Sequence, residues 1–251
     1  MRRYWLDASS INTVTNEVLI KGDPFHHIFD VCRQEQGSKF EIIVGDGKAY
    51  FVEVISIEKK QAKAQILEIR TLPALPTPHI HMAVSIPKYA TIESVIEKAV
   101  ELGVHTIHPF FSEHSFIRKS SSLPEGKLDR WKKIVISGTQ QTGRGELMQI
   151  EKPVDFKDLL KKFNQKPSAF GLFAYEGVSE TRIDRYLKTL DKTQPSEIWL
   201  FVGSEGGFSR TEVQEFQQVG LKSVSLGEQV LRVETACITL LSILKYEFEL
   251  F

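Results

Sequence analysis

The sequence predicts an α/β protein in which a mostly parallel sheet follows a small β-barrel. Three observations support this fold class. Short β-branched strands with tight turns dominate residues 1 to about 70, helices and strands alternate beyond residue 78, and a proline-rich segment separates the two patterns. Strands that alternate with helices are typical of a parallel sheet covered on both faces, whereas several short strands are typical of a small barrel.

The N-terminal part carries the strand signals of a barrel. Residues 39–44 form a β-branched strand that ends at Gly45-Asp46-Gly47, a strong hairpin signal. Further strands are expected over residues 49–57 and 62–69, and one short helix is expected from Pro24 to Cys32. Because three prolines interrupt residues 71–78, we predict a first domain over residues 1–72 and a second over residues 73–251.

The C-terminal part alternates between the two periodicities. Residues 91–102 have a helical apolar stripe that Gly103 terminates, and Ser209-Arg210-Thr211-Glu212 is a capping box that opens a helix to Val219. The last helix, residues 234–249, is apolar on most faces and is expected to be buried. The other expected strands are residues 79–86, 106–109, 169–174 and 197–202, and the other expected helices are residues 127–141 and 181–190.

Composition excludes several classes of protein. Apolar residues make up 41% of the 251 residues and charged residues 25%, as in an ordinary globular protein. Acidic and basic residues balance at 32 each, so RNA binding would require local clusters of arginine and lysine. Cys32 and Cys237 are expected to be reduced core thiols. No segment resembles a membrane span or a signal peptide, so we expect a soluble, cytoplasmic protein that does not bind membranes.

Two glycine-containing segments mark a candidate ligand site. The strand over residues 197–202 leads into Gly203-Ser204-Glu205-Gly206-Gly207, and a second strand end leads into Leu226-Gly227 and onward to Val230-Leu231-Arg232. Each is backbone-rich and carries an acid or an arginine, which is how α/β domains form small-ligand sites at the carboxyl ends of strands.

Plainer interpretations of the same residues stay open. The segment after Gly203 is neither a Walker phosphate loop nor a hydrolase elbow, but its glycines could serve only a structural turn with positive φ. Arg232 could be a salt-bridge partner of Glu234 rather than a functional group. His79 and His81 share a strand face, yet no cysteine or carboxylate completes a ligand set nearby, so no metal site is predicted.

Taken together, the segments resemble the RsmE family of ribosomal RNA methyltransferases in the SPOUT superfamily. Residues 203–209 are similar to its G-P-E-G-G motif, which continues with Phe or Leu and then Ser or Thr, and residues 226–236 are similar to its second hallmark, which ends in L-R-x-E-T-A. Further similarity lies in residues 97–104, in Arg130-Trp131-Lys132-Lys133-Ile134, and in two stretches that resemble H-H-x-x-x-V-x-R and E-Q-x-x-R, residues 26–33 and 140–144. The departures are Ser204 for proline, Gln229 for arginine, Gln140 for glutamate and a loop at residues 87–90 without the usual K-G pair.

The resemblance implies a knotted SPOUT domain, a PUA-like barrel and transfer of a methyl group from S-adenosyl-L-methionine to N3 of a uridine in 16S ribosomal RNA. It also implies a homodimer acting on the small ribosomal subunit. Arg232 is expected to stabilise the developing uracil anion, and Glu205 to act as a base or an orienting acid. The expected cofactor contacts are Ala174, Tyr175, Gly203, Ser204, Glu205, Gly206, Leu226, Gly227, Val230, Leu231, Thr235 and Ala236. The expected RNA contacts are Arg2, Arg3, Arg33, Lys88, Arg118 and Arg144.

Two alternatives remain at this point. One is a SPOUT methyltransferase that acts on a different RNA or base position. The other is an RNA-binding assembly factor that kept the fold and lost catalysis, although Glu205, Arg232 and Glu234 speak against it.

Overall fold

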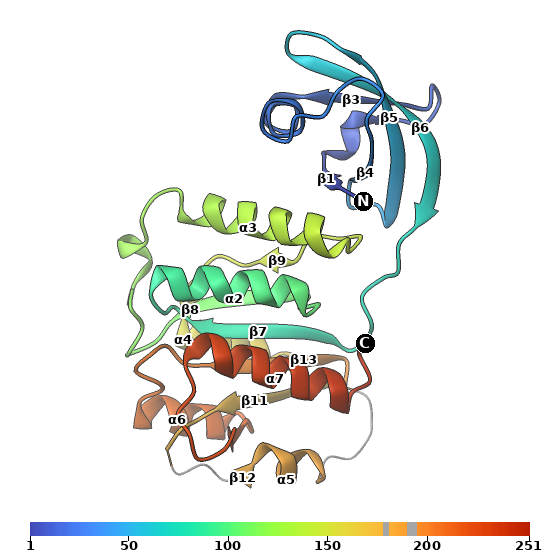
Figure 1. Ribbon diagram of the computed structural model, residues 1–251. Helices are drawn as coiled ribbons and strands as arrows, with labels where there is room; N and C mark the ends of the chain where they lie inside the picture. Colours follow the sequence, from blue (N-terminus) through green and yellow to red (C-terminus); the bar gives the residue numbers. More distant parts are fainter. Residues whose placement is uncertain (178–180, 190–194) are drawn as a thin grey trace. The chain divides into compact units, whose positions relative to one another are not determined.

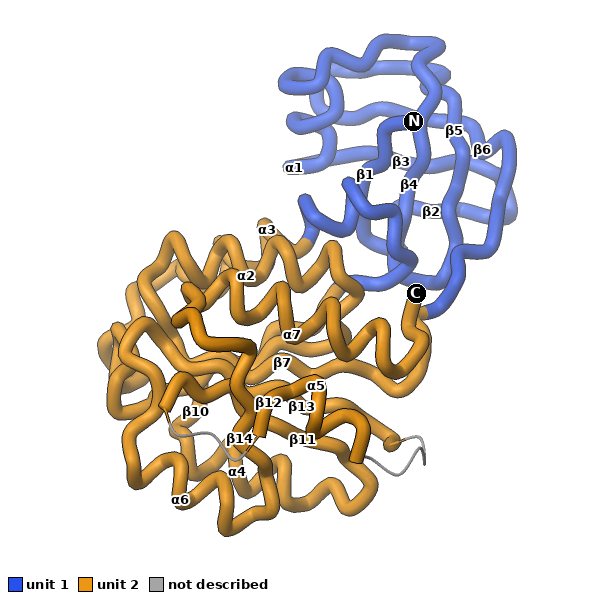
Figure 2. Tube along the Cα trace, turned by 60° about the horizontal axis from the view of Figure 1, so that its bottom comes forward, with its two compact units in different colours: residues 1–74, 136–147 blue, residues 75–135, 148–251 orange. Residues whose placement is uncertain are grey.

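The computed structural model describes residues 1–177, 181–189 and 195–251. The chain divides into two compact units (Figure 2). The first unit contains residues 1–74 and 136–147, and the second contains residues 75–135 and 148–251. Residues 136–147 join the first unit because the end of helix α3 (Lys127–Thr142) and the turn after it pack there, an assignment that the sequence pattern did not predict.

The first unit is built on a curled six-stranded sheet with the strand order β1-β4-β5-β6-β3-β2 (Figure 1). Strands β3 to β6 pair antiparallel, whereas β1 pairs parallel with β4. The strands are β1 (Arg3–Trp5), β2 (Ile11–Asn12), β3 (Glu17–Lys21), β4 (Lys39–Ile43), β5 (Lys48–Ile57) and β6 (Gln61–Thr71). The helix predicted from Pro24 to Cys32 is present in two parts, α1 (Gly22–Phe25) and a π-helical segment η2 (His26–Val31). The chain also has two short 3-10 helices, η1 (Ala8–Ser10) in the first unit and η3 (Ser120–Ser122) in the second.

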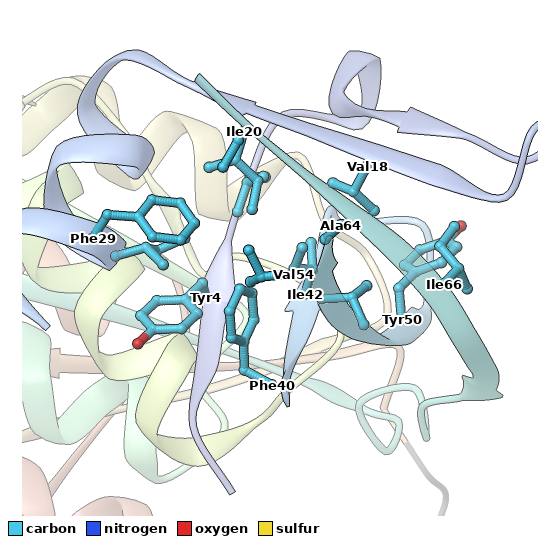
Figure 3. Packing of buried hydrophobic residues seen from close by; sticks show 14 residues of the cluster. Tyr4, Val18, Ile20, Phe29, Phe40, Ile42, Tyr50, Val54, Ala64 and Ile66 are labelled. Carbon is cyan, nitrogen blue, oxygen red and sulfur yellow. The ribbon is translucent and has the colours of Figure 1, made fainter. Parts of the chain in front are cut away.

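Alternating side chains of the strands fill the concave side of this sheet (Figure 3). Phe40 and Ile42 on β4 and Val54 on β5 are at most 1% exposed. Phe29 from η2 covers the same cluster, and the Tyr4 ring packs edge-on to Phe40 at 4.9 Å. The spacing of two residues between buried positions explains why these segments form strands rather than helices.

A buried carboxylate ties two strands of the first unit together. Glu41 on β4 accepts hydrogen bonds from Arg3 (Nε, 2.7 Å) on β1 and from Arg70 (Nε and Nη2, 2.7 and 3.0 Å) on β6. The hydrogen bonds from Arg70 and then Arg3 lower the pKa of Glu41 below its ordinary value, against the opposing effect of burial. Arg3 is therefore paired with Glu41 and is not the free phosphate contact that the sequence led us to expect.

This cluster predicts a pH-dependent loss of stability. Glu41→Gln should lower the free energy of unfolding at pH 7 by about 1–3 kcal/mol, because two charge-assisted interactions are lost. Since the pKa of Glu41 is depressed by folding, its contribution is present above the unfolded-state pKa and is lost as the pH falls through the folded-state pKa. The stability difference between variant and wild type, measured by urea denaturation, should therefore shrink below the ordinary carboxyl range.

The matched control is Glu53→Gln, which breaks the more exposed pair with Lys39 at 3.3 Å. It should cost no more than about 0.5 kcal/mol. Equal destabilisation by both substitutions, or a Glu41→Gln effect that is constant down to acidic pH, would contradict this interpretation.

The second unit contains the parallel sheet, with the strand order β10-β8-β7-β13-β11-β14-β12 and with β9 paired to β8. Every described strand pair in it is parallel. The strands are β7 (His79–Ser85), β8 (Thr106–Phe111), β9 (Gln149–Ile150), β10 (Val154–Asp155), β11 (Ala169–Ala174), β12 (Thr181–Arg182), β13 (Glu197–Val202) and β14 (Lys222–Ser225). The predicted fold class, an α/β protein with a mostly parallel sheet and a small β unit, is confirmed.

Helices cover both faces of this sheet (Figure 1). Helix α2 packs against α7 on one face, and α4 and α6 close an aromatic core on the other. The buried members of α2 are Ile92, Val95, Ile96, Ala99 and Val100, which is nearly the predicted stripe. The helices are α2 (Tyr89–Glu101), α4 (Phe156–Asn164), α5 (Ile183–Leu187), α6 (Arg210–Gln218) and α7 (Val233–Glu247).

Several local expectations need correction. Helix α5 is shorter than the helix predicted over residues 181–190, the end of which lies outside the described residues. Helix α7 is not buried throughout, since Tyr246 is 77% exposed. Cys237 is buried, and burial raises the pKa of its thiol, whereas Cys32 is only partly buried and packs against the core of the first unit. No described helix is long and apolar enough to cross a membrane.

The histidines of the parallel sheet form a stack near the amino ends of the strands. His79 stacks on His105 with ring centroids 4.3 Å apart, and His81 Nδ1 lies 3.0 Å from His108 Nε2. Both His81 and His108 also stack on Trp199. Burial lowers the pKa of His81 to about 4 and that of His108 to about 2, so both rings are neutral at pH 7. These residues pack the core at the edge of the sheet opposite to the glycine loops.

Candidate functional site

A cavity of about 570 Å³ opens at the carboxyl ends of four neighbouring strands, β7, β13, β11 and β14. The segment at the end of each strand contributes to the lining: Lys88 and Thr91 after β7, residues 174–176 at the end of β11, residues 203–205 and 207 after β13, and residues 225–227 and 229–234 at the end of β14. Parallel strands bring loops that are distant in the sequence to one edge of the sheet, which is where open α/β sheets bind ligands. The two glycine-containing segments predicted to form a site therefore line one cavity.

The turn after β13 is closely packed. Gly207 donates its N–H to the carbonyl of Ser204 at 2.9 Å, and its φ of +64° requires glycine or a strained residue. A Cβ at Gly203 would lie 3.0 Å from the backbone of Gly207. Of the three glycines in the turn, only Gly207 has a positive φ. Gly203 and Gly206 have ordinary φ values, and an added Cβ at either would lie too close to neighbouring protein atoms.

Glu205 projects from this turn to the N-terminus of α2. Its carboxylate accepts a hydrogen bond from the backbone N–H of Lys88 at 3.1 Å and one from Thr91 Oγ1 at 3.4 Å. A carboxylate at a helix N-terminus is stabilised by the helix dipole. Of the two roles that the sequence left open for Glu205, these contacts favour the orienting acid over the base.

The loop after β14 presents Arg232 at the N-cap position of α7. The side chain of Arg232 is exposed and lines the cavity. It forms no ion pair with any residue in the described part of the chain, including Glu234, which also lines the cavity. The salt bridge that the sequence offered as the plainer interpretation of Arg232 is therefore not formed.

Most of the predicted cofactor contacts lie together in this cavity. Gly206 and Thr235 are outside its lining, and Gly206 instead contacts His114. The predicted contacts that do line it are Ala174, Tyr175, Gly203, Ser204, Glu205, Leu226, Gly227, Val230, Leu231 and Ala236.

Two residues support the turn and the helix after it: His114, which the sequence did not single out, and Glu212, which it indicated only as a helix cap. His114 places Nδ1 2.8 Å from the carbonyl oxygen of Gly206, and its own carbonyl accepts a hydrogen bond from Ser204 Oγ at 2.7 Å. Ser204 stands where the resembled family has proline, so this hydroxyl supplies an anchor that proline lacks. Buried Glu212 accepts from the N–H groups of Ser209 and Glu113, both at 2.9 Å, and completes the predicted capping box.

The basic residues predicted to contact RNA separate into distinct environments. Lys88 lines the cavity, and Arg118 is exposed. Arg144 is largely buried, and burial lowers the pKa of its guanidinium, so it is poorly placed for a phosphate. Arg2, Arg3 and Arg33 line a separate hollow of the first unit.

A cavity formed by loops at the carboxyl ends of parallel strands is suited to a small ligand. Comparison with known proteins gives the class. A family model described as an RNA methyltransferase domain matches residues 73–245, and one described as an RNA methyltransferase PUA domain matches residues 20–67. The protein is an RNA methyltransferase.

Individual relatives define the family. The ribosomal RNA small subunit methyltransferase E of Aquifex aeolicus is 34% identical over 229 residues, covering 90% of this chain and 93% of the relative. The same enzyme of Bacillus subtilis is 26% identical over 100% of this chain and 98% of its own. A crystal structure of this enzyme from Neisseria gonorrhoeae bound to S-adenosyl methionine superposes with a TM-score of 0.83 at 26% identity, covering 98% of this chain and 97% of that one. The chain belongs to the ribosomal RNA small subunit methyltransferase E family.

Proposed function

We propose that this protein transfers the methyl group of S-adenosylmethionine to N3 of a uridine in 16S ribosomal RNA of the small subunit. The observation that carries the proposal is the cavity in which both glycine-containing loops meet beside Arg232, which forms no ion pair with any described residue. Family membership and the names of the relatives support the RNA substrate.

The residues of the cavity fit S-adenosylmethionine. Its volume of about 570 Å³ lies within the range of small-molecule sites. Glycine keeps the turn from Gly203 to Gly207 compact, since an added Cβ would meet neighbouring protein atoms, and the turn lines the cavity. Leu226, Val230 and Leu231 supply an apolar wall for an adenine ring. The sulfonium of the bound donor supplies an activated methyl group.

The protein's own residues must then align the uracil and accommodate charge. N3 of uridine is mostly protonated at neutral pH, so transfer requires loss of this proton and produces negative charge on the ring. Arg232 is the group at the mouth of the cavity that can stabilise this charge, and it is not neutralised by Glu234. Glu205 holds the β13 turn against α2, which fixes the loop in place.

The remaining parts of the proposal concern assembly and docking. We propose that residues 1–72 form an RNA-docking domain and residues 73–251 the methyltransferase domain, with the loop after β14 threaded as the resemblance implies. We also propose a cytoplasmic homodimer, and the apolar side chains that α7 leaves exposed, Ile238 and Tyr246, are suited to the dimer interface.

The activity itself is tested by incubating the protein with methyl-labelled S-adenosylmethionine and small ribosomal subunits that lack the modification. We expect label in 16S ribosomal RNA and none in subunits that are already modified. Absence of label with unmodified subunits, under conditions where the donor binds, would favour the non-catalytic assembly factor.

Donor binding should not require a metal. Among the described residues, no group of three or more His, Cys, Asp or Glu side chains could hold an ion, and this includes the three glutamates of the cavity, Glu176, Glu205 and Glu234. Isothermal titration calorimetry with and without a chelator should give the same affinity for S-adenosylmethionine. If the chelator abolishes binding of S-adenosylmethionine, the claim that binding needs no metal is wrong.

A further inference from the structure

The first unit contains a hollow of about 720 Å³ that the methyl-transfer site does not use. Two sequence motifs more than 100 residues apart meet there: the stretch ending Val31-Cys32-Arg33, and Gln140-Gln141 at the end of α3. Strand β1 forms the third side. The complete lining is Met1, Arg2, Arg3, Tyr4, His27, Val31, Cys32, Arg33, Gln140 and Gln141.

The charge of this hollow is positive in a protein whose formal net charge is zero. It contains no acidic side chain in its lining and three arginines. Arg3 is neutralised by Glu41, but Arg2 and Arg33 form no ion pair with any residue in the described ranges. Arg2 is held by one hydrogen bond from Nη1 to the carbonyl of Cys32, at 3.1 Å, which leaves other donors of its guanidinium available. Two exposed arginines that line one hollow are suited to a phosphate.

The backbone around Arg33 is unusual. Residues 26–31 form a π-helix, a rare conformation that is frequent at functional sites, and Arg33 follows with φ +53°. An arginine in the left-handed region is uncommon, and such strain persists only where the surrounding structure imposes it. The helix ends before Arg33, and Arg33 lines the hollow.

The other side chains of the hollow can contact a nucleobase. The exposed His27 ring lies edge-on to Tyr4 at 6.0 Å and offers a face for stacking. The Tyr4 hydroxyl is buried beside Arg2 and has no well-formed hydrogen bond to the described residues. Gln140 and Gln141 each carry an amide donor and acceptor that can pair with a base edge.

We propose that this hollow binds one nucleotide of a single-stranded RNA segment, with its phosphate on Arg2 and Arg33 and its base against His27 and the two glutamines. The inference rests on the proposed function, since it assigns the RNA-docking role to a defined site. Of the arginines expected to contact RNA, the proposal assigns the phosphate to Arg2 and Arg33. Arg3 is paired with Glu41 and Arg144 is largely buried, so neither is assigned to it.

The test uses the full-length protein and a fluorescein-labelled ten-nucleotide oligouridine, with binding measured by anisotropy at several salt concentrations. Arg2→Ala and Arg33→Gly should each weaken binding about tenfold. Each should also reduce the slope of log affinity against log salt by about 0.7, the value for one phosphate contact on a single strand. Glycine is chosen at position 33 because it adopts the observed φ without strain, so the charge is removed without harm to the backbone.

Lys60→Ala is the matched control, since it removes one exposed charge at the β5–β6 turn outside the hollow. It should leave both affinity and slope near wild type. An abasic strand of the same length tests the base contact: Gln140→Ala should weaken binding of oligouridine but not of the abasic strand.

Donor affinity and methyl transfer separate the two levels of the proposal. If the wild type binds S-adenosylmethionine and methylates subunits while Arg2→Ala and Arg33→Gly keep wild-type RNA affinity and salt slope, the nucleotide site is wrong and the enzyme assignment stands. If the wild type neither binds the donor nor methylates subunits, the proposed function itself fails. The site is supported if Arg2→Ala and Arg33→Gly weaken RNA binding and reduce the salt slope while Lys60→Ala changes neither.

Discussion

Arg232→Ala should lower the single-turnover rate of methyl transfer about 100- to 1000-fold while changing the affinity for S-adenosylmethionine little. Removing one preorganised electrostatic contact to charge that develops in a transition state typically costs about 3–4 kcal/mol. Arg232 lines the cavity at the N-cap of α7 and has no acidic partner among the described residues, so its positive charge is available to the substrate. Rapid-quench measurement with labelled donor and unmodified small subunits gives the rate, and calorimetry gives the affinity.

Two variants separate catalysis from loop structure. Glu234→Ala should have a smaller effect on the rate, because Glu234 does not pair with Arg232 in the structure. Arg232→Lys keeps the charge but not the planar guanidinium and should restore only part of the rate. If Arg232→Ala and Glu234→Ala cause similar losses of rate and of thermal stability, Arg232 serves only to hold the loop.

Gly203→Val should reduce the affinity for S-adenosylmethionine about 10- to 100-fold. Even a Cβ at this position would lie 3.0 Å from the backbone of Gly207, which cannot move aside as a flexible side chain would. The branched side chain must displace the turn that supplies the cavity wall, and overpacking of this kind costs about 1–3 kcal/mol. Gly206 is also among the expected cofactor contacts, but an added Cβ there would lie 2.8 Å from His114 Cβ, and Gly206 does not line the cavity.

The control for Gly203→Val is Ser209→Ala. Loss of the Ser209 cap should destabilise α6 by about 1 kcal/mol, since its hydroxyl accepts the N–H of Glu212. Ser209 does not line the cavity, so donor affinity should remain near wild type despite the lower stability. Equal loss of affinity in both variants would mean that the Gly203 turn affects binding only through stability.

The parts of the structure that the sequence predicted correctly are those fixed by local signals. Strands β11 and β13 and the capping box of α6 were predicted to the residue because short apolar runs, glycine turns and Ser-x-x-Glu spacing act locally. The cavity was predicted because parallel strands necessarily bring their carboxyl ends to one edge.

What could not be predicted depends on long-range contacts. Helix α4 was missed although its apolar positions, Phe156, Leu159, Leu160 and Phe163, have helical spacing. The capture of Arg3 by Glu41, the role of His114 beneath the glycine turn and the association of residues 136–147 with the first unit arise only when distant segments pack together. The hydrophobic periodicity of a single segment cannot predict which distant residue it will contact.

The central claim, methylation of N3 of a uridine in 16S ribosomal RNA, is tested most directly by mass-spectrometric mapping of that RNA. RNA would be compared from the parent strain, a strain lacking the gene, the deletion strain with the gene restored, and the same strain with the Arg232→Ala gene. We predict one N3-methyluridine that disappears on deletion, returns with the wild-type gene and does not return fully with Arg232→Ala. An unchanged modification in the deletion strain, or a lost methyl group on another base position or another RNA, would contradict this account.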